Sequence, residues 1–305
     1  VVELSSFQLH YLNEISPLVS AVLNVADDHL DWHGSLEAYA AAKGKIYHNT
    51  QIACIYNATD SVTHRLLQQS KNTDSAQAVG FTLFTPAPNE VGWVEDILID
   101  RAYVDTRDEA TELATIDDLK QIPVVSPHLL ANTAAAAAIA GGAGVQPNEI
   151  KRALNDFTLD AHRIQLVLEK DGVRWIDDSK ATNPHAASAA LASFESVIWI
   201  AGGLLKGVDI SALVEKHSSS LKAVIVIGVD RAEVLAALAI HAPDTKVFEI
   251  TEQSNIMQQV VTIAKEVAEP GDVVLLAPAA ASMDQFVDYA DRGNSFVAAV
   301  KKEVG

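Results

Sequence analysis

The sequence predicts an α/β protein with a doubly wound, mostly parallel sheet. Short runs rich in β-branched residues alternate with longer, alanine-rich segments along most of the 305 residues, and this alternation is typical of that architecture. Several of the short runs are almost continuously apolar, as expected of parallel strands that are buried on both faces. At about 150 residues per domain, the length indicates roughly two domains.

The predicted strands are the short apolar runs, and the predicted helices lie between them. Strands are expected at residues 21–25, 52–56, 174–176, 197–200, 223–227, 246–250 and 273–276. Helices are expected at residues 36–48, 132–140, 147–156, 183–193, 231–240, 255–267 and 295–303. Residues 71–125 are polar and alternate in character over 92–100. They predict an antiparallel or irregular excursion in place of another βα unit.

The domain boundary is expected near residues 157–162, after one predicted helix and before a new series of strands. We therefore expect a first domain at 1–159 and a second at 160–305. The chain begins with Val1 and has no initiator methionine, and its first residues read as a strand. Since a natural chain seldom begins inside a strand, we expect a truncated, processed or partially recorded start.

The composition disfavours two classes of partner. The formal net charge is −18, from 22 Lys+Arg against 40 Asp+Glu, and such a surface repels nucleic acid and anionic membranes. No apolar run reaches the roughly 18–20 residues of a membrane span, and no signal peptide is visible. The single cysteine, Cys54, lies in an apolar run; it reads as a core residue and fits a reducing compartment. We therefore expect a cytoplasmic protein, and a monomer.

Ligands of α/β sheets gather at the carboxyl ends of the strands, and polar residues follow two of the predicted strands. Asp27, Asp28, His29 and Asp31 follow the strand at 21–25; they suit Mg²⁺, which takes one or two carboxylates, or simply form a capped polar turn. The segment 177–184, Asp-Asp-Ser-Lys-Ala-Thr-Asn-Pro, follows the strand at 174–176. It predicts either an anion site at a helix N-terminus or a capped loop.

Three further segments carry weaker signals. The turn 201–207 holds two adjacent glycines and Lys206, but it matches neither GxGxxG nor GxxxxGK(S/T). The small residues at 277–282 would let a ligand approach the backbone, or would only pack beneath a helix. His162-Arg163 stands at the expected domain junction, where an arginine can reach phosphates. Lys43 reads on general grounds as part of a solvated helix face.

Taken together, these segments resemble the Mur ligases of peptidoglycan synthesis, most of all the members that join D-glutamate to UDP-N-acetylmuramoyl-L-alanine. The stretches that carry the resemblance run in the same order as in the family. They are 3–9, 24–31, 128–132, 162–163, 178–183, 278–286 and 292–294. The resemblance implies the remainder of a central ATPase domain followed by a Rossmann-like C-terminal domain. It also implies an ATP-dependent ligase that forms an acyl phosphate before the amide.

The resemblance further implies roles for individual residues. Glu3, His29 and Lys43 would hold Mg²⁺, Lys43 as a carbamylated lysine, and His29, Lys43 and Lys180 would act in catalysis. Asn132, Arg163 and Asp178 would contact ATP, and Ser5 the nucleotide-linked substrate. The D-glutamate pocket would be formed by Lys180, Thr182, Lys206, Ser282, Met283 and Tyr289.

This sequence departs from the family pattern at three places, of which Tyr289, the aromatic residue near the D-glutamate pocket, is a tolerable change. Leu129 follows His128 where the family usually has asparagine, which puts one adenine contact in doubt. The family's glycine-rich phosphate loop and nucleotide-sugar domain would precede Glu3, so we expect this chain alone to be inactive. Three alternatives stay open: a sibling Mur ligase or folylpolyglutamate synthase, a nucleotide-binding module without catalysis, and a Rossmann dehydrogenase. The absence of GxGxxG argues against the last of these.

Overall fold

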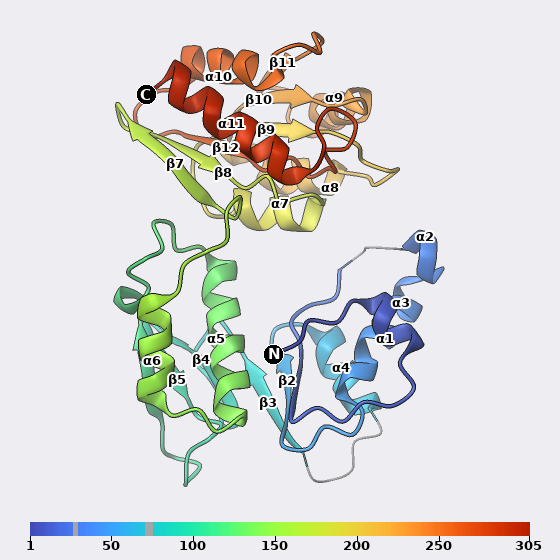
Figure 1. Cartoon of the computed structure of the whole chain (residues 1–305), viewed down its shortest axis with the longest axis vertical. Helices are drawn as coiled ribbons and strands as arrows, with labels where there is room; N and C mark the ends of the chain where they lie inside the picture. Colours follow the sequence, from blue (N-terminus) through green and yellow to red (C-terminus); the bar gives the residue numbers. More distant parts are fainter. Residues whose placement is uncertain (27–29, 71–75) are drawn as a thin grey trace. The chain divides into compact units, whose positions relative to one another are not determined.

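The chain folds into two units, Val1–Phe157 and Thr158–Gly305 (Figure 1). The computed structural model describes residues 1–26, 30–70 and 76–305, with the backbone alone for Leu30 and Asp31. Within these residues, each unit is built on one six-stranded sheet in which parallel pairs predominate. The α/β class predicted from the sequence is confirmed.

The sheet of the first unit has the strand order β1-β2-β3-β4-β5-β6. Its strands are β1 (Val19–Val22), β2 (Ala53–Asn57), β3 (Gln77–Phe81), β4 (Glu90–Val94), β5 (Ile97–Asp100) and β6 (Thr111–Thr115). Strands β1 to β4 are parallel, and β5 and β6 continue the sheet in antiparallel fashion. The antiparallel excursion predicted within 71–125 is therefore present, although β3 from the same segment joins the parallel part.

Helices cover both faces of this sheet. Its helices are α1 (Ser6–Tyr11), α2 (Leu30–His33), α3 (Leu36–Gly44), α4 (Ser61–Gln69), α5 (Pro127–Gly142) and α6 (Pro147–Asp156). Successive side chains of β2 alternate between the two cores, as the pleat requires. Ala53 and Ile55 pack with the alanines of α5, whereas Cys54 packs with Ala40 of α3 and Leu66 of α4. Cys54 is thus the buried core residue that the sequence predicted.

The start of the chain corrects one expectation. Residues 1–5 form no strand, and helix α1 begins at Ser6. Ser5 caps this helix by accepting a hydrogen bond from the Gln8 N–H, and the Gln8 side chain accepts one from the Ser5 N–H. This reciprocal capping satisfies two N–H groups that a helix start otherwise leaves open.

The sheet of the second unit has the order β11-β10-β9-β12-β8-β7, and only the β7–β8 pair is antiparallel. Its strands are β7 (Gln165–Lys170), β8 (Val173–Asp177), β9 (Val197–Gly202), β10 (Leu221–Ile227), β11 (Lys246–Glu249) and β12 (Val273–Leu276). All residues of β9 and β12 are buried, which explains their continuous apolar runs.

Five helices complete the described part of the second unit: α7 (Pro184–Leu191), α8 (Ser211–His217), α9 (Arg231–His241), α10 (Ile256–Val267) and α11 (Tyr289–Glu303). Apolar residues of α10 and α11 pack against one face of the sheet around Trp175 and Phe296. Helix α9 contacts β9 and β10. Across the described ranges, every helix is too short or too polar to cross a bilayer.

Candidate functional site

The carboxyl ends of β8, β12 and β9 form the candidate site of the second unit. These three strands are neighbours in the sheet and run parallel, so the loops that follow them emerge at one edge. The loops span residues 178–183, 203–208 and 277–288, and they carry six of the residues to which the sequence assigned a role: Asp178, Lys180, Thr182, Lys206, Ser282 and Met283.

A buried arginine holds two of these loops together. Arg292 of α11 is fully buried. Its guanidinium donates to Ser179 Oγ at 3.0 Å, to the Ser179 carbonyl at 2.9 Å and to the Ala280 carbonyl at 3.1 Å. Ser179 Oγ in turn donates to the Tyr289 carbonyl. Burial lowers the pKa of Arg292 to about 10, so it remains charged at neutral pH and fixes the loops after β8 and β12.

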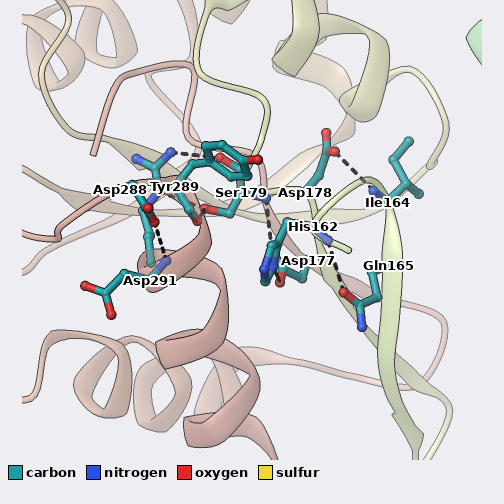
Figure 2. Close-up of polar contacts among 10 residues, drawn as sticks. His162, Ile164, Gln165, Asp177, Asp178, Ser179, Asp288, Tyr289 and Asp291 are labelled. Atoms are coloured by element: carbon teal, nitrogen blue, oxygen red, sulfur yellow. Dashed lines mark hydrogen bonds and ion pairs between the residues drawn. The ribbon is translucent and has the colours of Figure 1, made fainter. Parts of the chain in front are cut away.

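His162 and Asp177 form a second buried pair beneath the site (Figure 2). His162 Nδ1 lies 2.7 Å from Asp177 Oδ2, and Asp177 Oδ1 accepts the Ser179 N–H at 2.9 Å. His162 has φ of 64°, which is uncommon for a residue other than glycine. Its carbonyl accepts the Lys180 N–H at 3.2 Å, and this contact positions the backbone of Lys180.

Gly293 makes room for the His162–Asp177 pair. A Cβ at this position would stand 2.2 Å from His162 Nδ1 and 2.8 Å from Asp177 Oδ2. We therefore expect Gly293→Ala to destabilise the protein by about 1–3 kcal/mol through overpacking, although alanine is the better helix former. Urea unfolding measures this loss. Asn294→Ala, at the exposed neighbouring position of α11, should cost nothing, and equal effects of the two changes would contradict the prediction.

Asp178 is buried beside this pair and carries an unusual proton equilibrium. Its Oδ1 accepts the Ile164 N–H at 3.1 Å (Figure 2). Its own N–H donates to the Leu276 carbonyl. Burial, assisted by the neighbouring Asp177 carboxylate, raises the pKa of Asp178 to about 7. Because ionisation is disfavoured in the folded state, the contribution of Asp178 to stability is complete below its unfolded pKa and is lost as the pH rises through 7.

Asp178→Asn tests this proton equilibrium, since asparagine does not titrate and can still accept the Ile164 N–H. We expect the free energy of unfolding of the variant, relative to the wild type, to rise by about 2–3 kcal/mol between pH 5 and pH 8. Urea titrations of both proteins at several pH values measure the difference. A difference that stays constant with pH would show that Asp178 ionises normally.

Lys180 and Tyr289 come together at the edge of the site. Lys180 Nζ lies 5.4 Å from the centroid of the Tyr289 ring, within cation–π range. The Tyr289 ring also meets the His162 ring edge-on at 6.3 Å. Thr182 is half-buried in the same loop, and Asn183 caps α7 by accepting the Ala186 N–H at 2.9 Å. The loop therefore caps α7, which was one of the two interpretations of the sequence, and it also carries Lys180.

The glycine turn after β9 packs its backbone directly against the neighbouring loops. A Cβ on Gly202 would stand 2.2 Å from the Ile227 carbonyl oxygen, and one on Gly203 would stand 2.3 Å from that of Ala281. Leu204 and Ala281 exchange two backbone hydrogen bonds. This pairing joins the turn that carries the exposed Lys206 to the loop that carries Ser282.

Neighbouring side chains in the loop after β12 differ in their exposure to solvent. Ser282 is 3% exposed, whereas Met283 is 62% exposed. Arg163 is also exposed, and its Nε lies 3.8 Å from Asp160 Oδ2. One edge of the second unit thus carries Lys180, Thr182, Ser282 and Tyr289.

The sequence assigned no individual role to His162, Asp177 or Arg292, although His162 and Arg292 fall in segments that carried the resemblance.

The first unit holds the remaining residues of the predicted site. Glu3 is exposed and precedes α1, which packs against α3, the helix that carries Lys43. Lys43 Nζ lies 5.3 Å from the centroid of the Tyr39 ring. Ser5 is the cap of α1, and Asn132 is exposed on α5. Leu129 is 6% exposed, so the position where the family usually has asparagine contributes to the apolar interior.

The predicted metal ligands are only partly covered by the structure. His29 lies outside the described residues, as do Asp27 and Asp28. For Asp31, the structure describes the backbone only. Among the residues that are described, His, Cys, Asp and Glu form no group of three suited to a metal ion. Of the predicted ligands, Glu3 has a carboxylate that the structure describes; it is exposed, which suits a cation such as Mg²⁺ that keeps several of its waters.

Comparison with known proteins gives matches along nearly the whole chain. The Mur ligase middle domain matches residues 1–140, and the glutamate ligase domain of Mur ligases matches residues 162–280. The UDP-N-acetylmuramoylalanine–D-glutamate ligase of Leifsonia xyli is 50% identical over 100% of this chain and 60% of the relative. That of Streptomyces coelicolor is 47% identical over 99% and 64%. The chain thus spans less than two thirds of these relatives.

Solved structures of Mur ligases share the fold. MurF from Acinetobacter baumannii has a TM-score of 0.68 at 18% identity, covering 94% of this chain and 60% of that one. MurF from Thermotoga maritima, solved in complex with ADP, has a TM-score of 0.64 at 16% identity and covers 98% and 65%. At such identities the likeness establishes the fold alone.

Proposed function

The chain belongs to the Mur ligase family, and we propose that the complete polypeptide containing it joins D-glutamate to UDP-N-acetylmuramoyl-L-alanine at the expense of ATP. Relatives named as D-glutamate ligases, 40–50% identical over nearly all of this chain, support this specificity. The observation that carries the proposal is the edge of the second unit, where Lys180 lies against Tyr289 and Ser282 is buried nearby.

This edge suits a small amino acid with two carboxylates. Lys180 and Lys206 supply ammonium groups, and Ser282 and Thr182 supply hydroxyl donors that are shielded from solvent to different degrees. Charge-assisted hydrogen bonds of this kind are stronger than neutral ones. The exposed Met283 and the ring of Tyr289 would cover the aliphatic part of the substrate. We propose this set as the D-glutamate pocket.

Three residues, Asn132, Arg163 and Asp178, are proposed to contact ATP. Asn132 is exposed on α5, Arg163 is exposed after the first unit ends, and Asp178 lies at the carboxyl end of β8. An exposed guanidinium can meet phosphate oxygens in bidentate fashion. Asp178 has one carboxylate oxygen on the Ile164 N–H, which leaves its other oxygen available as an acceptor.

Mg²⁺ would be held by Glu3, His29 and a carbamylated Lys43, and Ser5 would contact the nucleotide-linked substrate. An unmodified ammonium cannot ligate a cation, whereas a carbamate presents the oxygen donors that Mg²⁺ prefers. When bound, the ion offsets the negative charge of the transferring phosphoryl group. This part of the proposal rests on the family pattern and on the packing of α1 against α3.

The proposed chemistry has two steps. A carboxylate oxygen of UDP-N-acetylmuramoyl-L-alanine attacks the γ-phosphorus of ATP, and ADP leaves. The amine nitrogen of D-glutamate then attacks the acyl carbon, loses a proton, and displaces inorganic phosphate as the amide forms. Lys180, together with His29 and Lys43, would act next to the reacting groups. The protein would work as a cytoplasmic monomer on small molecules, without nucleic acid or membrane.

Oxygen-isotope transfer tests this route in the complete polypeptide. UDP-N-acetylmuramoyl-L-alanine labelled with oxygen-18 in its carboxylate is incubated with ATP, Mg²⁺ and D-glutamate, and the released phosphate is analysed by mass spectrometry. Because the acyl C–O bond breaks, each phosphate should carry one labelled oxygen. Unlabelled phosphate, or phosphate release that does not require D-glutamate, would contradict the proposal. A reaction without D-glutamate in the wild type serves as the baseline.

A further inference from the structure

Two side chains beyond the proposed pocket hold the turn that follows β10, which is separated from β12 in the sheet by β9. Asp284 and Gln285 follow Ser282 and Met283 in the loop after β12. Asp284 Oδ2 accepts the Val229 N–H at 2.9 Å, and Gln285 Oε1 accepts the Gly228 N–H at 2.8 Å. Gly228 and Val229 directly follow β10. The pair therefore satisfies two consecutive N–H groups of that turn.

The turn after β10 in turn supports the loop that carries Lys206. Gly228 packs so closely that a Cβ would stand 2.2 Å from the Gly203 nitrogen. Asp230 Oδ2 accepts the Leu205 N–H at 2.7 Å, and the Asp230 N–H donates to the Gly203 carbonyl at 3.3 Å. Contacts thus lead from Asp284 and Gln285 through residues 228–230 to Leu205, the neighbour of Lys206.

The remaining polar atoms of Asp284 and Gln285 have different surroundings. Gln285 Nε2 donates to Gln253 Oε1 at 2.9 Å. Asp284 Oδ1 is buried and has no hydrogen-bond partner among the described residues. A buried carboxylate oxygen without a donor is costly, so the local structure tolerates a penalty at Asp284 while its other oxygen holds Val229. The Asp284 carboxylate also favours the charged form of the buried Arg292, and its Oδ2 holds the turn after β10.

We propose that Asp284 and Gln285 are positioning residues that set the amino-acid pocket by holding the 228–230 turn beneath the Lys206 loop. The identity of the substrate, D-glutamate, rests on the proposed function. The coupling between Asp284, Gln285 and the Lys206 loop rests on the hydrogen bonds alone. Neither side chain is proposed to touch D-glutamate. Their loss should let Lys206 drift relative to Ser282 and weaken binding of the amino acid, while the ATP contacts at Asp178 and Arg163, in other loops, stay in place.

The kinetic test compares Asp284→Ala, Asp284→Asn and Gln285→Met in the complete polypeptide. Asp284→Ala and Gln285→Met remove the acceptor for the turn, and we expect each to raise the KM for D-glutamate about tenfold, as a lost hydrogen bond of this kind would. The KM for ATP should stay within about twofold of the wild type. Asparagine keeps an acceptor for the Val229 N–H, so Asp284→Asn should restore most of the D-glutamate affinity.

Asp272→Ala is the matched control for general destabilisation. Asp272 is likewise a loop carboxylate, buried more deeply than the half-buried Asp284, and it accepts the Glu269 N–H at 2.7 Å and a Lys222 hydrogen bond at 2.6 Å. It lies immediately before β12, at the opposite end of the strand from Asp284. Its loss should lower the unfolding midpoint without changing the KM for D-glutamate. Equal KM changes in Asp272→Ala and Asp284→Ala would overturn the proposal.

Amide hydrogen exchange on this chain tests the coupling without any ligase activity. In Asp284→Ala, exchange should accelerate at Val229 and also at Leu205 and Lys206, while the amides of α10 and α11 remain as in the wild type. Faster exchange at Val229 alone would overturn the inference and leave the proposed function untouched. A wild type that shows this coupling but does not use D-glutamate would contradict the proposed function and leave the coupling intact.

Discussion

Replacement of Arg292 by methionine should destabilise the second unit by about 3–5 kcal/mol, the range expected when one partner of a buried charged network is removed. Arg292 supplies three hydrogen bonds to Ser179 and Ala280 from a fully buried position. Methionine fills a similar volume but donates none of them, so two buried carbonyl groups lose their donor. The loops after β8 and β12 would also lose the side chain that joins them.

Unfolding in urea measures this effect through Trp175 and Trp199, which are buried in the second unit. Replacing Trp32 and Trp93 by phenylalanine confines the signal to that unit. Lys301→Met, at an exposed position of the same helix, is the control and should leave the midpoint almost unchanged. A loss below about 1 kcal/mol for Arg292→Met, within the range of an ordinary surface change, would show that the buried guanidinium does not hold the loops.

Replacement of Lys180 by methionine should reduce kcat/KM for D-glutamate about 100-fold or more in the complete polypeptide. A charge-assisted hydrogen bond to a carboxylate contributes about 1.5–3 kcal/mol, and the proposed catalytic contact adds a loss in kcat. The aliphatic stem of methionine can still pack against Tyr289, so the loop should keep its fold. Steady-state kinetics with varied D-glutamate measures the change.

Lys246→Met provides the matched loss of charge, because Lys246 is exposed at the start of β11 and so lies away from the carboxyl edge. Its kinetics should match those of the wild type. If Lys180→Met retained more than about a third of the wild-type kcat/KM, the lysine would not contact the substrate in the transition state. The assignment of the pocket to this edge would then be wrong.

The regular elements were predictable where local signals and burial agree. Helix α6 begins and ends as expected, because Pro147 suits a first turn and Gln146 and Glu149 form a capping box. Helix α11 instead begins at Tyr289, six residues before the predicted start at 295. Gly293 and Asn294 lower the helix propensity of that turn, and the need for a glycine there arises from His162, far away in the sequence.

The loops that carry the proposed site residues could be predicted from the sequence, but the buried side chains that hold these loops in place could not. Asp178, Lys180 and Ser282 follow predicted strands, and the rule that ligands gather at the carboxyl ends of parallel strands singled them out. Arginine is rarely fully buried, so no pattern identified Arg292 as the residue that joins two loops. The His162–Asp177 pair likewise depends on a contact between residues 15 positions apart in different elements.

The most direct test of the proposed activity is a competition among acceptors in one reaction. The complete polypeptide is given UDP-N-acetylmuramoyl-L-alanine, ATP and Mg²⁺ with equal concentrations of deuterium-labelled D-glutamate, unlabelled L-glutamate, glycine, L-alanine, L-lysine and diaminopimelate, and the products are identified by mass. The proposal predicts a single product that carries the deuterium label of D-glutamate. A product formed from any other amino acid in its place would contradict it.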